Sequence, residues 1–250
     1  MKINDKRFDR SLNKIFQFLS ENHKINRDIQ ISGINHVIPD EMPIEGRVIR
    51  LLRSIYKTQS RPNLDAAKEF FEWIEKEKHN LNSYKNFKTS LINKNREHNS
   101  QTIYEALRAC GGWGEKTSAL FLKNLLLIKH SPRLNSKFWS DLNLDGEKVF
   151  LPVDAVIREI FFKLTDEKMN FKSINKLLHN RGYDNNQMII WDDLWFWGFI
   201  TQSSKIKGEH RGIAWNPAKY WAIEESKKDV DSIKHIIKLA KTFIGLIDKK

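Results

Sequence analysis

The chain has 250 residues, of which 40% are hydrophobic, so it is long enough to bury a substantial core. Its formal net charge of +12 favours a polyanionic partner, although basic proteins that bind no nucleic acid also exist. The single cysteine, Cys110, excludes a disulfide framework, a four-cysteine zinc site and an iron–sulfur cluster held by cysteines. We therefore expect an intracellular protein without a metal cluster.

The sequence shows no membrane-directed segment. Met1 is followed by KINDKRFDR, which has no apolar region of the kind found in signal peptides. The longest apolar stretch, LFLKNLLLI, is too short and too charged to span a bilayer. We expect a soluble protein.

Apolar residues recur at three- and four-residue spacing through most of the chain, and this pattern predicts helices. The predicted helical segments are 6–20, 47–58, 64–78, two helices within 102–124, two helices after Asp154, 185–199 and 226–247. Residues 22–46 contain two glycines and two prolines, and they have loop composition. Residues 79–100, rich in Asn, Lys and Ser, are expected to be a mobile connection with at most one short helix. Because no clear strand is found, the expected fold class is all-α.

A row of basic residues lies on one face of the predicted helix 47–58. Its members follow one another at three- and four-residue steps, away from the apolar stripe: Arg47, Arg50, Arg53 and Lys57. The row is either a solvated charged face or a set of phosphate contacts, and both interpretations stay open. If the row contacts phosphates, Arg50 and Arg53 are the residues that we expect to bind DNA.

The most informative stretch is TIYEALRACGGWGEKTSALFLKN, residues 102–124. Thr102 and Glu105 match a capping box that opens a short helix, and Lys116 falls in the first turn of the next helix. Three glycines interrupt the two helices: Gly111, Gly112 and Gly114. Glycines let the backbone approach a polyanion closely, and the N–H groups at a helix start form a phosphate site.

Lys116 and Asp154 are the candidate catalytic residues. The dipole at a helix start disfavours a protonated amine, which makes Lys116 a candidate nucleophile. Asp154 follows Pro152 at the start of a helical pattern, so its carboxylate can accept backbone N–H groups and be held as an anion. Alone, Lys116 would be a surface lysine that contacts phosphate, and Asp154 a simple helix cap. Together they favour catalysis.

The motif GGWGEK, followed by an apolar helix and then by PVD at another helix start, resembles the helix-hairpin-helix DNA glycosylases over about residues 45–200. The resemblance implies one glycosylase unit over 1–250 with two helical lobes, 47–153 and 1–46 plus 154–250, and an active site in the cleft between them. The long segment before Asp154, HSPRLNSKFWSDLNLDGEKVFL, is taken as an inserted loop. It makes the archaeal 8-oxoguanine glycosylases the most similar branch, and Cys110 alone cannot hold the iron–sulfur cluster of endonuclease III-like members.

The resemblance also implies residue roles. Lys116 would attack C1′ of the flipped nucleotide and form a Schiff base, while Asp154 would stabilise the positive charge on the sugar. Gly112 and Gly114 would hold a phosphate through their N–H groups, and their carbonyls are a possible site for a monovalent cation. Trp113 stands where a small aliphatic residue is usual, so it either packs inward or lies against a sugar.

The place of Gln59, in YKTQSRP, is similar to that of a glutamine which fills the gap left by the flipped nucleotide. Gln59 is either that wedge or a glutamine in a surface turn.

Asp193 and Trp197 are four positions apart, and the two residues therefore share one helix face. An indole there could stack on a base while an acceptor-only carboxylate reaches the N1–H and N2–H of a guanine lesion. The archaeal enzymes resemble this arrangement. The alternative is that the tryptophans of this segment are core residues and that Asp192 and Asp193 face solvent.

We therefore expect a monomeric enzyme of base excision repair, located in the cytoplasm with the nucleoid or in the nucleus. It would flip and excise a damaged base, 8-oxoguanine first, from duplex DNA, and it would have AP lyase activity. No metal cofactor is expected. Two alternatives remain, namely a glycosylase for alkylated or other bases that uses water alone, and a non-catalytic DNA-binding module that keeps the hairpin as a phosphate clamp.

Overall fold

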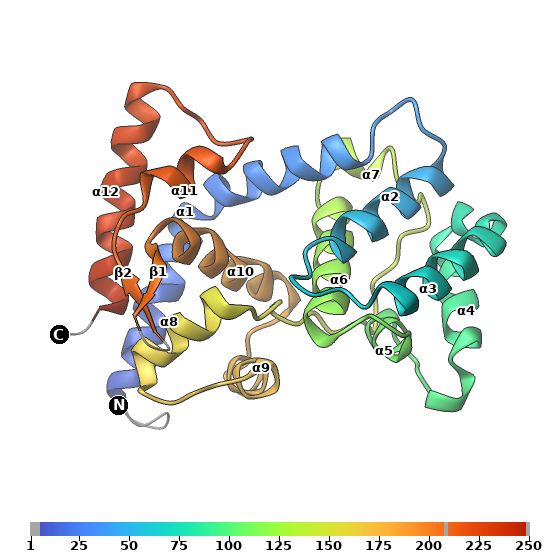
Figure 1. Ribbon diagram of the computed structural model, residues 1–250, viewed down its shortest axis with the longest axis horizontal. Coiled ribbons are helices and arrows are strands. Elements are labelled where there is room, and N and C mark those ends of the chain that lie inside the picture. The colour runs from blue at the N-terminus through green and yellow to red at the C-terminus, as the bar shows by residue number, and fades with distance from the viewer. Residues whose placement is uncertain (1–5, 208–209, 249–250) are drawn as a thin grey trace. The chain divides into compact units, whose positions relative to one another are not determined.

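The structure is a computed structural model that describes residues 6–207 and 210–248. Apart from one small β-hairpin, its regular elements are helices, so the fold class is all-α as the sequence predicts (Figure 1). The chain divides into a terminal unit, Met1–Ile29 with Val153–Lys250, and a central unit, Gln30–Pro152. Residues 30–46, which were expected with the terminal segments, belong to the central unit.

The terminal unit is built around one buried helix, α10 (Asn185–Ile200). Four elements of this unit pack with it or with one another: the first part of α1 (Lys6–Val37), α8 (Ala155–Thr165), α11 (Pro217–Ala222) and α12 (Val230–Ile247). The unit also contains α9 (Phe171–Asn180) and the antiparallel strands β1 (Gln202–Lys207) and β2 (His210–Ile213). The fully buried ring of Trp197 packs against Phe18 of α1 and Phe243 of α12.

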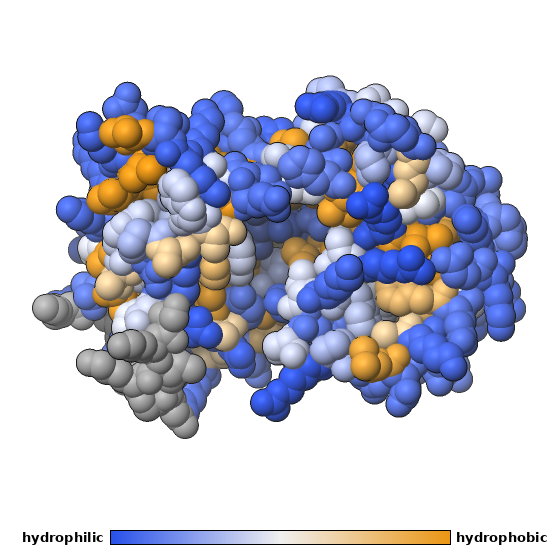
Figure 2. Space-filling view, turned by 45° about the horizontal axis from the view of Figure 1, so that its top comes forward, coloured by the Kyte–Doolittle hydropathy of each residue, from blue (hydrophilic) through white to orange (hydrophobic). Residues whose placement is uncertain are grey.

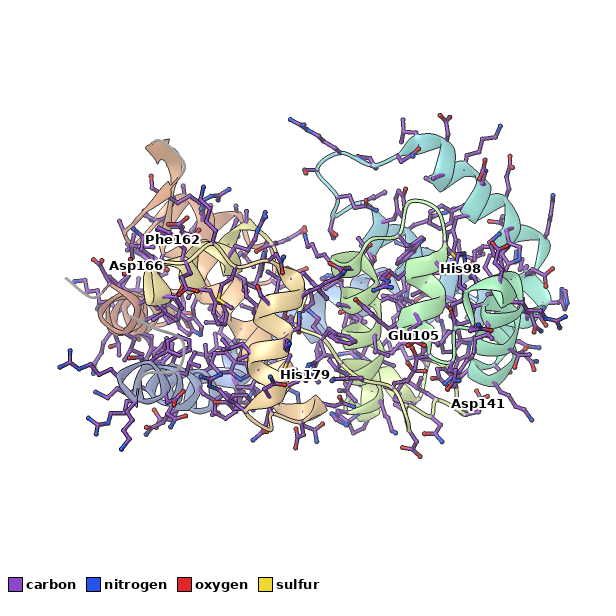
Figure 3. All side chains as sticks on the ribbon, turned by 90° about the horizontal axis from the view of Figure 1, so that it is seen from below. His98, Glu105, Asp141, Phe162, Asp166 and His179 are labelled. Atoms are coloured by element: carbon purple, nitrogen blue, oxygen red, sulfur yellow. The ribbon has the colours of Figure 1, made fainter. Side chains whose placement is uncertain are left out.

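A glycine sets the close approach of α8 to α10. A Cβ at Gly198 would lie 2.6 Å from Val156 Cγ1 and 2.7 Å from Ile160 Cδ1, which is too close for any side chain. The approach therefore fixes the start of α8, where Asp154 lies. At its other end α8 ends at Thr165; the next residue, Asp166, donates its N–H to the carbonyl of Phe162, and its left-handed φ of 59° turns the chain away from the helix (Figure 3).

The central unit is built around α6 (Glu115–Lys129), which is buried along most of its length. Its other helices are α2 (Ile44–Tyr56), α3 (Leu64–Lys76), α4 (Tyr84–Lys94), α5 (Ile103–Ala109) and the single turn α7 (Pro132–Asn135). Two short 3-10 segments, η1 (Lys78–Asn82) and η2 (Arg96–His98), connect them. Residues 79–100, expected to be a connection with at most one short helix, thus contain α4. Phe87 of α4 stacks on Trp139 with ring centres 5.2 Å apart, and it also contacts Phe121 of α6 at 6.0 Å.

The expectation that residues 22–46 form a loop is wrong over most of that range. Helix α1 continues without a break to Val37, through Gly33. A glycine inside a helix costs only about 1 kcal/mol relative to alanine, and tertiary contacts offset that cost here. Asn26 and Ile34 are both buried, and the Asn26 side chain donates a hydrogen bond to α10.

The β-hairpin was also missed. Its strands run through QSSKIK and HRGI, with the register Ile206 opposite Arg211 and an irregularity between Gln202 and Ile206. These segments are short and polar and lack a regular alternation of apolar residues, which is the signal on which strand prediction depends.

The segment expected to be an inserted loop caps two helices of the central unit. The carboxylate of Asp141 accepts the N–H groups of Tyr84 and Lys85, at 2.8 and 3.0 Å, at the start of α4 (Figure 3). The carboxylate of Glu147 accepts the N–H of Ile103 at the start of α5 and pairs with Lys88 at 2.7 Å. Because α5 leads directly into the glycine turn, this segment supports the candidate site.

The surface in Figure 2 is mainly hydrophilic, with hydrophobic residues in small groups. Among the residues that the structure describes, no helix combines the length and the apolar character needed to cross a membrane.

Removing the Glu147 carboxylate should destabilise the protein. In Glu147→Ala the Ile103 N–H and the Lys88 ammonium lose a fully buried partner, so the free energy of unfolding should fall by about 3 kcal/mol. The measurement is the urea unfolding midpoint and slope. Asp145→Ala, at an exposed position of the same segment, should change the free energy by less than about 0.5 kcal/mol. Equal midpoints for the two variants would contradict the capping role.

Candidate functional site

The candidate site begins at the turn between α5 and α6. The predicted capping box is confirmed: Thr102 Oγ1 accepts the Glu105 N–H at 3.2 Å, and Glu105 accepts the Thr102 N–H at 3.2 Å. Helix α5 ends at Ala109, and α6 starts at Glu115. The intervening residues, 110–114, form what we call the glycine turn.

The backbone conformation and the surroundings of Gly112 both require glycine. Its φ of +80° lies in the left-handed region, and a Cβ there would lie 2.3 Å from the Tyr56 hydroxyl and 3.3 Å from Ala66 Cβ. The Tyr56 hydroxyl in turn donates to the Asn63 carbonyl at 2.9 Å. The end of α2 and the start of α3 therefore hold the turn in place.

Gly114 is a different case. Its φ of −95° is open to any residue, and a Cβ there would meet nothing within 4 Å. No contact within the unit therefore requires a glycine, and the exposed backbone stays accessible to a ligand. The Gly114 N–H donates to Thr117 Oγ1 at 3.0 Å, whereas the N–H groups of Gly111 and Gly112 have no acceptor among the described residues.

Lys116 lies in the first turn of α6, as the sequence predicts, and its side chain is half-buried. Its ammonium group forms no hydrogen bond or ion pair with any residue in the described part of the chain. A first helical turn has N–H groups without helical acceptors, and these add to the free N–H groups of the glycine turn. The arrangement can hold an anion beside an amine that has no competing carboxylate.

Asp154 is the N-cap of α8, as the sequence predicts. Its Oδ1 accepts the N–H groups of Val156 and Ile157, at 2.8 and 3.0 Å. Its Oδ2 accepts nothing from the described residues, and the side chain is half-buried. One oxygen therefore fixes the carboxylate while the other is available to an external group.

Gln59 and Trp113 both contact the glycine turn from within the central unit. The Gln59 side-chain amide donates to the Gly112 carbonyl at 3.1 Å, so in this structure Gln59 braces the turn. Trp113 packs inward, which is the first of the two interpretations of this residue. Its buried ring lies 5.1 Å from Phe70 and 5.9 Å from Tyr56, and its core position leaves no face for a sugar.

The four members of the basic row on α2 differ in their surroundings. Arg47 donates to the carbonyls of Pro39, Asp40 and Lys137, so it holds the segment before α2. Exposed Arg53 lies 3.3 Å from Glu75 and 5.6 Å from the centre of the Phe71 ring. Arg50 and Lys57 are exposed, and neither has a partner among the described residues.

Asp193 is neither at a surface nor open to a base in this structure. Its side chain is 1% exposed, and both oxygens accept hydrogen bonds from α1: Oδ2 from His23 Nδ1 at 2.8 Å, and Oδ1 from Asn26 Nδ2 at 2.7 Å. Burial raises the pKa of Asp193 to about 6, and the hydrogen bond from His23 opposes that rise. Asp192 is likewise buried, so the solvent-facing alternative for these two acids is wrong as well.

Trp197 lies in the core of the terminal unit with 0% of its surface exposed, so its ring is not open to a stacked base in this structure. Of the three neighbouring tryptophans, Trp191 is also fully buried, whereas Trp195 is exposed. The core alternative thus holds for Trp191 and Trp197 and is wrong for Trp195.

His23 and Asn26 were not identified from the sequence, because they fall in the segment expected to be a loop. The spacing of His23 and Asn26, three positions apart as on one face of a helix, was the signal that the sequence offered for them.

Among the described residues, no group of three or more His, Cys, Asp or Glu is arranged to bind a metal ion. Comparison with known proteins adds no assignment, because no family model, curated protein or solved structure matches the chain.

The two glycines should respond differently to alanine. Gly112→Ala should lower the free energy of unfolding by about 2 kcal/mol or more, because its φ is positive and the new methyl group meets the Tyr56 hydroxyl. Gly114→Ala should change it by no more than about 0.5 kcal/mol, since the position is open and its φ is permissive. Urea unfolding measures both. Equal losses would show that the turn does not have this geometry.

Asp193 should make stability depend on pH between about 4 and 6. The folded-state pKa, about 6, lies above the unfolded value of about 3.9, so the native state binds the extra proton in this window. Stability should therefore fall as pH rises, by roughly 3 kcal/mol across the window. The difference between wild type and Asp193→Asn isolates this effect. Asp231→Asn, at an exposed position, is the control, and parallel profiles for wild type and Asp193→Asn would contradict the assignment.

Proposed function

We propose that this chain is a helix-hairpin-helix DNA glycosylase with associated lyase activity, which excises a damaged base from duplex DNA. The observation that carries the proposal is the position of Lys116. Its amine has no partner among the described residues, and Lys116 lies in the first turn of α6, directly after the glycine turn, in which two N–H groups have no acceptor among those residues. An anion site and a candidate nucleophile are therefore side by side.

The glycine turn would bind a DNA phosphate. The free N–H groups of Gly111 and Gly112 and the first turn of α6 supply donors, and the helix dipole favours a negative charge there. The open surface at Gly114 lets a backbone approach without a steric barrier. Exposed Arg50 and Lys57, on α2 of the same unit, supply positive charge without an acidic partner in the described part of the chain.

The chemistry follows from the amine. The lone pair of Lys116 Nζ attacks C1′ of the flipped nucleotide, and the C1′–N bond breaks with its electron pair leaving on the base, which takes up the proton that Nζ loses. Opening of the sugar ring then gives a Schiff base between Nζ and C1′. Loss of a proton from C2′ expels the 3′ phosphate, and water finally releases the lysine.

Asp154 would stabilise the positive charge that develops on the sugar. Two backbone N–H groups already hold Oδ1, so the carboxylate needs no reorganisation when the charge appears, and Oδ2 remains available.

The proposed lesion is 8-oxoguanine. This choice rests on the sequence resemblance, because Asp193, whose ionised carboxylate would suit the N–H donors of a guanine-type base, is buried in this structure. A base that reached this carboxylate would compete with the hydrogen bonds from His23 and Asn26. Base release from a panel of lesion duplexes tests this part of the proposal separately from the chemistry at Lys116.

Single-turnover base release tests the proposed function. Lys116→Gln should still bind the lesion duplex but should lose nearly all base release, because the nucleophile is absent. Asp154→Asn should keep the helix cap and slow release at least 100-fold, as expected for about 3 kcal/mol of transition-state stabilisation. Lys129→Gln, at the other end of α6, is the matched control and should retain the wild-type rate.

Three outcomes would overturn the proposal or change its class. Wild-type release by Lys116→Gln would assign the chemistry to water and make the enzyme monofunctional. Duplex binding without release from any duplex of the panel would leave a DNA-binding module. No binding of any duplex would contradict the proposal entirely.

A further inference from the structure

The outer face of α10 carries two aromatic side chains where a polar strip is expected. From Trp191 to Ile200 every side chain of this helix is buried except those of Trp195 and Phe199. The two residues are four positions apart and therefore share one face. A buried helix normally presents polar residues where it meets solvent, yet Trp195 is 37% exposed.

The two rings are stacked, so each covers part of one face of the other. Their centres are 5.2 Å apart and their planes differ by only 9°, which is an offset parallel stack. The ammonium group of Lys219, from α11, lies 5.0 Å from the centre of the Phe199 ring. A cation therefore lies over the Phe199 ring of the stack.

Lys219 is held in place and is not neutralised. Its Nζ donates to the Gln202 carbonyl at 2.7 Å. Burial lowers the pKa of Lys219, and the charge of Arg211, on β2, lowers it further. Neither cation pairs with an acidic side chain among the described residues. Gln202 pairs with Ile213 of β2, two positions from Arg211, so both cations belong to the surface beside the hairpin, and without a counter-charge they favour an anionic ligand.

We propose that Trp195, Phe199, Lys219 and Arg211 form a binding site for single-stranded DNA. An unpaired base stacks on the exposed indole, and the adjoining phosphates contact the two cations. Stacking on aromatic side chains beside a basic surface is the general means of binding unpaired strands, whereas the bases of a duplex keep their faces covered. The site is separate from the glycine turn and from Lys116, and its occupancy does not depend on base excision.

The test is the affinity of undamaged oligo-dT, measured by fluorescence anisotropy at several salt concentrations. Trp195→Ala should weaken binding about tenfold, within the range measured for one stacked base, while Trp195→Phe should retain most of the affinity. Arg211→Gln removes one charge and should reduce the slope of log affinity against log salt by about 0.7. Trp221→Ala is the matched control, because Trp221 is 58% exposed and contacts Lys228 but stacks on no ring of the described residues.

Unchanged affinity of both Trp195→Ala and Arg211→Gln would overturn the proposal, and Arg211→Gln gives an independent result should Trp195→Ala fail to fold. Equal losses in Trp195→Ala and Trp221→Ala would also overturn it. So would a change of oligomeric state in Trp195→Ala with unchanged oligo-dT affinity, because the face would then belong to a second copy of the chain. Because the oligonucleotides carry no lesion, none of these results depends on whether Lys116 cleaves a base.

Discussion

The left-handed backbone of Gly112 is the constraint on which the candidate site depends. It sets the direction in which α6 leaves the turn, and therefore where the first N–H groups of that helix and Lys116 lie. The Tyr56 hydroxyl and Ala66 fill the space that a side chain would need, so the turn is fixed from outside as well as by its own φ. A preorganised anion site follows, because the donors are in place before any phosphate arrives.

Buried carboxylates hold the helices around this turn and around α10. In the central unit, Glu147 satisfies the first N–H of α5, which is the helix that enters the turn. In the terminal unit, Asp193 joins α10 to His23 and Asn26 of α1. A buried carboxylate without partners would cost several kcal/mol, and both residues therefore select the one arrangement in which their partners meet them. Asp154 differs, because only its Oδ1 accepts hydrogen bonds from the part of the chain that the structure describes.

The sequence predicts what local chemistry decides. The capping box of Thr102, the N-cap role of Asp154 and the position of Lys116 at a helix start all depend on residues within one turn of each other, and the structure has each of them. The all-α class follows from apolar periodicity in the same way.

What the sequence could not supply is set by contacts between distant segments. Helix α1 extends through Gly33 because Asn26 meets a carboxylate on α10, and that pairing leaves no local signal. The burial of Asp193 has the same origin. The hairpin of β1 and β2 was missed because its strands are short and polar.

Covalent trapping tests the central claim, that Lys116 is a nucleophile, most directly. Borohydride added during the reaction with an 8-oxoguanine duplex should reduce the Schiff base and join the protein to the DNA, and peptide mapping should place the adduct on Lys116. Base release without any adduct, or an adduct on Lys129 in place of Lys116, would contradict the account.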